Sequence, residues 1–78
     1  MAILNITYNG LSADYPIEVD GVVSDADLKR IAVEVVRNGE VPGLHLPNIN
    51  LRAFDGFVVD RLQGGARLYL RQKVPFGA

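Results

Sequence analysis

The side chains best suited to catalysis or metal binding are few and scattered in this sequence. His45 is the single histidine, and cysteine is absent. General acid–base catalysis needs a positioned partner, and zinc sites combine several histidine or cysteine ligands at short spacings. No second ligand stands at such a spacing from His45, so we expect this side chain to be solvated. The sequence therefore predicts no metal, no cofactor and no enzymatic activity.

The carboxylates have separate structural explanations. Asp25 and Asp27 follow Ser24 in the first turn of an expected helix, where the helix dipole favours acids. Asp55 and Asp60 lie at or near expected turns. A carboxylate pair formed in three dimensions is left open, although the spacing gives it no support. No glycine-rich phosphate loop precedes the helix.

Size and charge narrow the class of protein further. The chain has 78 residues, of which 49% are hydrophobic, and a formal net charge of −1. This length fits one domain with one modest core. The balanced charge predicts no nucleic-acid surface, and the N-terminal sequence has neither a basic region nor a long apolar run. The lack of cysteine fits a reducing compartment. We expect a cytoplasmic monomer that binds no membrane.

Alternating apolar residues predict a β-hairpin at the start of the chain. The alternation over residues 3–8 is typical of a half-buried strand. Asn9-Gly10 tolerates the positive φ angles that a tight hairpin turn requires. A second strand is expected over 13–19. Pro16 indicates that this is an edge strand, because proline cannot donate a ladder hydrogen bond.

A single amphipathic helix is expected between Ser24 and Asn38. Ser24 is a favourable N-cap, and Gly39 is suited to the left-handed position that ends a helix. Apolar residues recur at helical spacing and form one stripe. The stripe consists of Leu28, Ile31, Ala32, Val35 and Val36.

Three more strands are expected after a loop over residues 40–48. Apolar residues alternate over 49–54, a short strand follows over 57–62, and the last strand covers 67–71. Gly64-Gly65 reads as the turn between the last two strands. This element order predicts an α+β fold, the β-grasp, in which one helix covers a mixed sheet of four or five strands.

The β-grasp places the first and last strands side by side in the centre of the sheet. A ferredoxin-like sheet would need a second helical stripe, and a small barrel would leave the helix unexplained. We expect four residues to meet in the core between helix and sheet. These are Ile31, Val35, Leu68 and Leu70.

Arginine and aromatic residues concentrate at positions that alternation places in solvent. If the strand over 49–54 lies beside the last strand, these side chains share the sheet face that points away from the helix. Arginine and aromatic residues are enriched in protein interfaces, so we expect a protein-binding face. The alternatives are an ordinary solvated face and, against the neutral total charge, nucleic-acid binding by stacking on Phe54 and Tyr69. The residues are Arg52, Phe54, Arg67, Tyr69 and Arg71.

Several segments, in order, resemble ubiquitin. They are residues 24–28 (SDADL), 39–42 (GEVP), 51–56 (LRAFDG) and 66–71 (ARLYLR). The pattern spans nearly the whole chain and resembles the ubiquitin-like β-grasp family of prokaryotic type. Two features depart from it: the segment between the third and last strands is shorter than in ubiquitin, and the sequence does not end in Gly-Gly.

The resemblance implies a protein modifier or a protein-binding module that acts through its exposed sheet face. Residues 1–72 would then form the domain and 73–78 a flexible C-terminal tail. A modifier would need a processing peptidase to remove Ala78 and an adenylating enzyme to activate Gly77. The alternative is a small non-catalytic accessory subunit of an enzyme complex or secretion system, since β-grasp proteins of this size also occur there.

Overall fold

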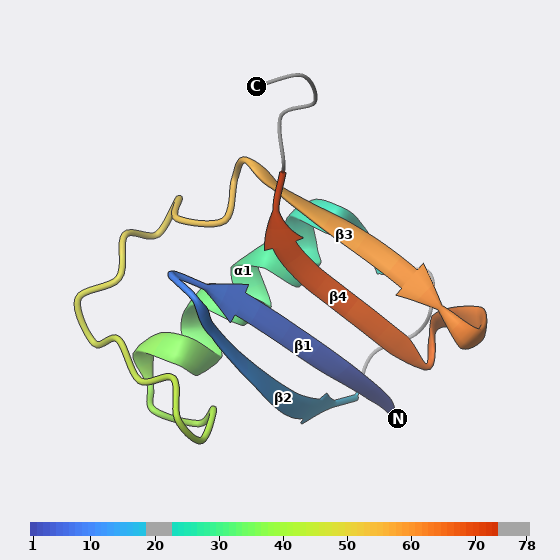
Figure 1. The fold of residues 1–78 in the computed structure, drawn as a ribbon, viewed down its shortest axis with the longest axis horizontal. Helices are drawn as coiled ribbons and strands as arrows, with labels where there is room; N and C mark the ends of the chain where they lie inside the picture. Colours follow the sequence, from blue (N-terminus) through green and yellow to red (C-terminus); the bar gives the residue numbers. More distant parts are fainter. Residues whose placement is uncertain (19–22, 74–78) are drawn as a thin grey trace.

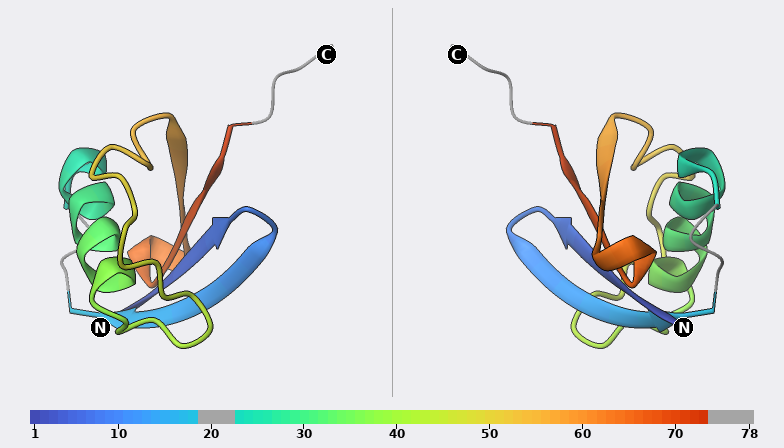
Figure 2. Two further views of the ribbon diagram at one scale, coloured as in Figure 1. Left: turned by 90° about the vertical axis from the view of Figure 1, so that its left-hand side faces the viewer. Right: turned by 90° about the vertical axis from the view of Figure 1, so that its right-hand side faces the viewer.

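The computed structural model describes residues 1–18 and 23–73 as one helix packed on one sheet (Figure 1). The elements are β1 (Ala2–Tyr8), β2 (Leu11–Ile17), α1 (Asp25–Arg37), β3 (Phe57–Leu62), the short 3₁₀-helix η1 (Gln63–Gly65) and β4 (Arg67–Gln72). Seen from the side, α1 covers one face of the sheet (Figure 2). The predicted α+β class, with one α-helix and a mixed sheet, is confirmed for the described residues.

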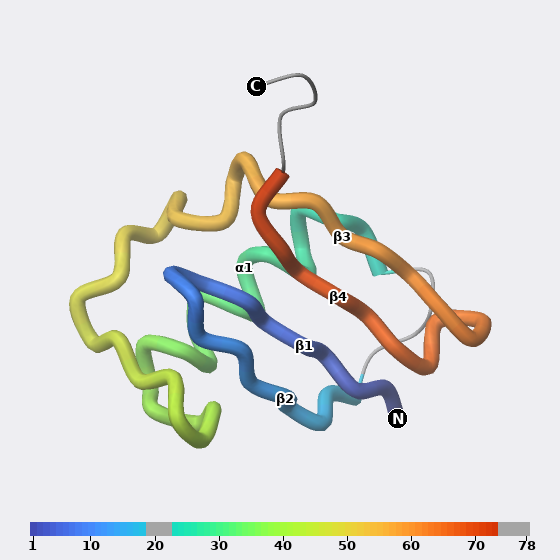
Figure 3. Tube along the Cα trace, in the orientation of Figure 1, coloured from blue at the N-terminus to red at the C-terminus, as the bar shows by residue number. Residues whose placement is uncertain are grey.

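The strands lie in the order β2-β1-β4-β3. β1 is antiparallel to β2 and parallel to β4, and β3 is antiparallel to β4. The first and last strands therefore lie side by side in the centre, as predicted and as the chain trace shows (Figure 3). This topology is compatible with a β-grasp-like fold.

The β1–β2 hairpin turns as the sequence predicts. Asn9 and Gly10 have φ angles of 50° and 80°, which a two-residue turn with positive φ at both central positions requires. β2 is an edge strand, so Pro16 removes no hydrogen bond from the interior of the sheet. The strand starts earlier than the expected residue 13, and the expected end at residue 19 lies outside the described residues.

Both ends of α1 are capped by the predicted residues. Ser24 has extended backbone angles, and its Oγ accepts a hydrogen bond of 3.1 Å from the Asp27 N–H. At the other end, Gly39 has a φ of 76°, which suits glycine after a helix. No helix in the described ranges is long and apolar enough to cross a membrane.

The core lies between α1 and the inner face of the sheet. Val35, Leu68 and Leu70 are buried there as predicted, while Ile31 is half-buried and packs against the same cluster. The loop after the helix adds buried side chains that periodicity did not identify. These are Val41, Leu44 and Phe54.

The predicted strand over residues 49–54 is wrong. Residues 51–56 form consecutive turns and residues 49–50 belong to no strand, so the sheet has four strands among the described residues. The Asn50 side-chain Oδ1 accepts the Arg52 N–H at 2.8 Å, and the Asn50 carbonyl accepts the Ala53 N–H at 3.0 Å. These local bonds occupy backbone groups that a strand ladder would need. The neighbour of β4 is consequently β3.

Candidate functional site

Three of the five predicted partner-binding residues lie together on β4. Arg67, Tyr69 and Arg71 alternate with Leu68 and Leu70, which are fully buried against the helix side. Successive side chains of a strand point to opposite faces of its sheet. The three residues therefore lie on the face away from α1, where the sequence placed them.

Phe54 does not belong to this face. Its side chain is 1% exposed and lies in an aromatic cluster, with ring centroids 5.6 Å from Tyr8 and 5.0 Å from Phe57. The expectation of an exposed Phe54 depended on a strand over residues 49–54. Because that segment forms turns instead, the Phe54 side chain points into the core. It holds the loop against the aromatic cluster.

Arg52 is exposed but lies in the loop, away from the sheet. Its Nε donates a hydrogen bond of 2.7 Å to Asp55 Oδ2. This hydrogen bond, together with the nearby charge of Asp55, raises the pKa of the Arg52 guanidinium above its usual value. Arg52 therefore forms a local ion pair within a turn and does not extend the β4 group.

Neighbouring strands complete the surface around the three β4 residues. Tyr69 pairs in register with Asn5 of β1 and Asp60 of β3. Arg67 pairs in the same way with Ile3 and Leu62. Directly opposite residues share a sheet face. We define the outer sheet face by these pairs and Arg71: Ile3, Asn5, Asp60, Leu62, Arg67, Tyr69 and Arg71.

The sequence carries a signal for these additional members in the alternation of two strands. Alternation in β1 already separated Asn5 from the inward Leu4 and Ile6. The same alternation in β3 separates Asp60 and Leu62 from Val59. Only the strand order and the register together bring the outward residues of three strands side by side.

The β3–β4 part of the outer sheet face contains a shallow depression of about 400 Å³. Arg71 Nε lies 2.6 Å from Asp60 Oδ2, an ion pair that holds both side chains in place beside Tyr69. Leu62 is 50% exposed at the same location. The depression thus combines an aromatic ring, an oriented arginine and an exposed aliphatic side chain; its lining is Asp60, Arg61, Leu62, Tyr69 and Arg71.

The β1–β2 side of the sheet has a different character. Asn5 Nδ2 donates to Ser12 Oγ at 3.0 Å and to Asp14 Oδ1 at 2.9 Å, and Thr7 joins the same network. These polar groups already satisfy one another, so they have less capacity for new hydrogen bonds. The β1–β2 side of the sheet is therefore occupied by its own hydrogen-bond network.

Other candidate residues remain isolated. His45 is exposed, and its ring lies over Gly39, where an added Cβ would come within 3.2 Å of it. Within residues 1–18 and 23–73, no group of three or more His, Cys, Asp or Glu side chains is arranged to hold a metal ion. Gly77, the predicted conjugation residue, lies outside the described residues.

The sequence and the fold were compared with known proteins. Neither the protein-family models, nor the curated proteins, nor the solved structures give a match to this chain.

Proposed function

We propose that this chain is a ubiquitin-like β-grasp domain that acts by binding another protein through its outer sheet face. The ubiquitin-like assignment is supported by two independent features. One is the strand order β2-β1-β4-β3 with parallel central strands and one covering helix. The other is the series of segments that resemble ubiquitin, of which the helix opening and the last strand occupy the expected elements.

The observation that carries the proposal is the depression beside Tyr69. Tyrosine and arginine are enriched among residues that dominate binding energy. The Tyr69 side chain loses little conformational entropy on binding, because it has few rotatable bonds. The Asp60 carboxylate already orients the Arg71 guanidinium. Preorganised side chains lose less entropy when a partner binds. Leu62 adds apolar surface that is exposed in the free protein.

Affinity purification from the native host tests this proposal. A tagged Tyr69→Ala/Arg71→Ala protein should recover the bound partner at least tenfold less efficiently than wild type. Arg52→Ala is a matched control, because it also removes an exposed arginine but lies away from the sheet. Quantitative mass spectrometry measures recovery, and circular dichroism checks that each variant is folded. Equal recovery of every protein by wild type and the double variant would rule out the outer sheet face.

The modifier role is a second proposal, supported by the resemblance to ubiquitin. It requires release of Ala78 and an isopeptide bond from Gly77 to a lysine of another protein. Among possible acceptors within this chain, Lys73 is exposed, whereas Lys29 is half-buried. Chains of modifiers should therefore form through Lys73.

Mass spectrometry of the tagged protein from its host distinguishes the modifier from the accessory subunit. A modifier gives Gly77-linked peptides on other proteins, and these disappear with Gly77→Ala. An accessory subunit retains its full mass and purifies in a constant ratio with one enzyme or secretion component. Normal behaviour of a Gly77→Ala protein would exclude conjugation and leave the binding proposal unaffected.

A further inference from the structure

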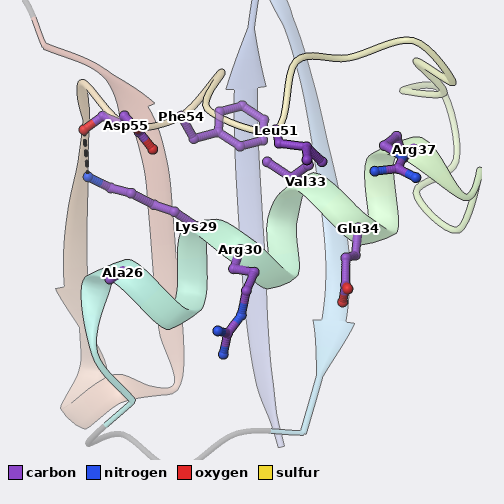
Figure 4. Close-up of a pocket in the computed structure, with 9 residues that line it drawn as sticks. All are labelled: Ala26, Lys29, Arg30, Val33, Glu34, Arg37, Leu51, Phe54 and Asp55. Atoms are coloured by element: carbon purple, nitrogen blue, oxygen red, sulfur yellow. Dashed lines mark hydrogen bonds between the residues drawn. The ribbon is translucent and has the colours of Figure 1, made fainter.

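A second surface lies on the other side of the molecule, between α1 and the loop over residues 51–55. It is a groove of about 660 Å³. Val33, Leu51 and Phe54 gather between the helix and the loop and form its apolar part (Figure 4). Leu51 is 65% exposed, whereas Val33 and Phe54 are almost fully buried. An exposed leucine beside an apolar floor offers a site for one apolar side chain.

Cations stand at both ends of this groove. Lys29 extends towards Asp55 at one end, and Arg37 lies at the other (Figure 4). The Lys29 ammonium has three donors, and within the described residues it donates one hydrogen bond, to the neutral Asp55 carbonyl. Arg37 is absent from the ion pairs of the described residues. Both charges are therefore available to a ligand.

The remaining charges of the groove are mostly neutralised. Asp55 is paired with Arg52 at 2.7 Å, and Arg30 is paired with Asp27 at 2.9 Å. Glu34 also lines the groove and belongs to no ion pair of the described residues, but its side chain points to the side of the helix away from the loop (Figure 4). On the side nearer the loop, the apolar floor is thus flanked by two cations, and the complementary ligand carries two negative charges.

The positions of Lys29 and Arg37 along the helix define the form of the ligand. Lys29 and Arg37 are eight residues apart in one helix, which places their Cα atoms about 12 Å apart. In an extended chain, residues i, i+2 and i+4 point to the same side and span about 13 Å. An extended segment can therefore place acids at i and i+4 over the two cations and an apolar residue at i+2 over Leu51.

We propose that this groove binds an extended segment of a partner protein in which an apolar residue is flanked, two positions away on each side, by acidic residues. The central side chain packs against the exposed Leu51. The flanking carboxylates pair with Lys29 and Arg37. The groove lies on the helix layer and shares no lining residue with the outer sheet face, so this inference is independent of the binding proposal above.

A labelled peptide, acetyl-Glu-Ser-Leu-Ser-Glu-amide, tests the proposal with the full-length chain. Fluorescence anisotropy should give saturable binding with a Kd below about 1 mM, which is within the range of a weak specific complex. Replacing both glutamates by lysine, or the leucine by serine, should abolish saturation. NMR signals of residues 29, 33, 37 and 51 should shift in the complex.

Two variants with equal loss of charge locate the site. Lys29→Gln/Arg37→Gln should weaken binding by about fivefold or more, since exposed ion pairs are individually weak. Arg67→Gln/Arg71→Gln, on the outer sheet face, should leave the affinity unchanged. Leu51→Ser should also weaken binding without changing stability, because Leu51 is largely exposed.

Three results would overturn the proposal. The first is no saturation with wild type. The second is equal weakening by the two charge variants, which would indicate non-specific attraction. The third is concentration-dependent dimerisation of the free chain that Leu51→Ser abolishes, since the groove would then be occupied by a second copy. Sedimentation equilibrium measures that dimerisation.

Discussion

At the scale of single residues, Phe54 connects the long loop to the core. Its ring meets Tyr8 of β1 and Phe57 of β3 edge-on, at 5.6 and 5.0 Å between centroids. Edge-to-face aromatic pairs contribute beyond the area that they bury. One ring therefore fixes the loop, the end of β1 and the start of β3 together, and it also forms the floor of the groove.

Removal of this ring should be strongly destabilising. Phe54→Ala should lower the free energy of unfolding by about 3–5 kcal/mol, because it leaves a cavity at a fully buried position. Leu51→Ala, three residues earlier and mostly exposed, should change it by less than about 0.5 kcal/mol. Urea denaturation measures both. A similar, small effect of the two substitutions would show that residue 54 is not in the core.

The backbone angle of Gly39 restricts which residues can follow the helix. Its φ of 76° is in the left-handed region, so Gly39→Ala should cost about 1–2 kcal/mol of stability. An added Cβ would also lie 3.2 Å from the His45 ring, but that ring is exposed and free to move aside. We expect Gly39→Ala/His45→Ala to be no more stable than Gly39→Ala in thermal denaturation. Recovery in the double variant would show that the His45 contact, not the backbone angle, dominates.

At the scale of elements, the parts of the chain specified by nearby residues could be predicted and those specified by distant contacts could not. The limits of α1 follow from a serine cap, a glycine stop and one apolar stripe, all within the helix and its flanks. The first hairpin likewise follows from Asn9-Gly10. Such local signals need no knowledge of the rest of the fold.

The loop before β3 shows why alternation alone was insufficient. Apolar and polar residues alternate over 49–54 as they do in a strand. However, the Arg52 N–H donates to Asn50 Oδ1, and this hydrogen bond forms a local turn. Asp55 donates its N–H to the Arg52 carbonyl at 3.1 Å and continues the series of turns. The same error placed Arg52 and Phe54 on the candidate face. The β4 residues were placed correctly because the buried Leu68 and Leu70 fix the alternation of that strand.

The Ser24 cap of α1 can be tested by substitution. Ser24→Ala should destabilise the domain by about 1 kcal/mol, because the Asp27 N–H loses the Ser24 Oγ acceptor. Ser24→Asp retains an acceptor and should be close to wild type. Amide hydrogen exchange at residues 26 and 27 should accelerate in the alanine variant only. Unchanged exchange there would mean that the Ser24 side chain does not cap α1.

At the scale of the whole molecule, the two layers present two separate surfaces. The outer sheet face lies on one side, and the groove lies beside α1 on the other, with the buried core between them. The shortest extent of the molecule is only 19 Å. Two partners approaching from opposite sides would not compete for the same residues, so a single small domain can bridge them.

Site-specific photo-crosslinking in host cells tests most directly whether the outer sheet face binds a protein. A photoreactive phenylalanine analogue at position 69 retains an aromatic ring beside Leu62 and Arg71. Irradiation should produce a discrete covalent adduct with the partner recovered by affinity purification. The same analogue at position 48, in the exposed loop after α1, should give none. If position 69 gives no adduct although the partner is recovered, or if both positions give the same adducts, the outer sheet face is not the binding site.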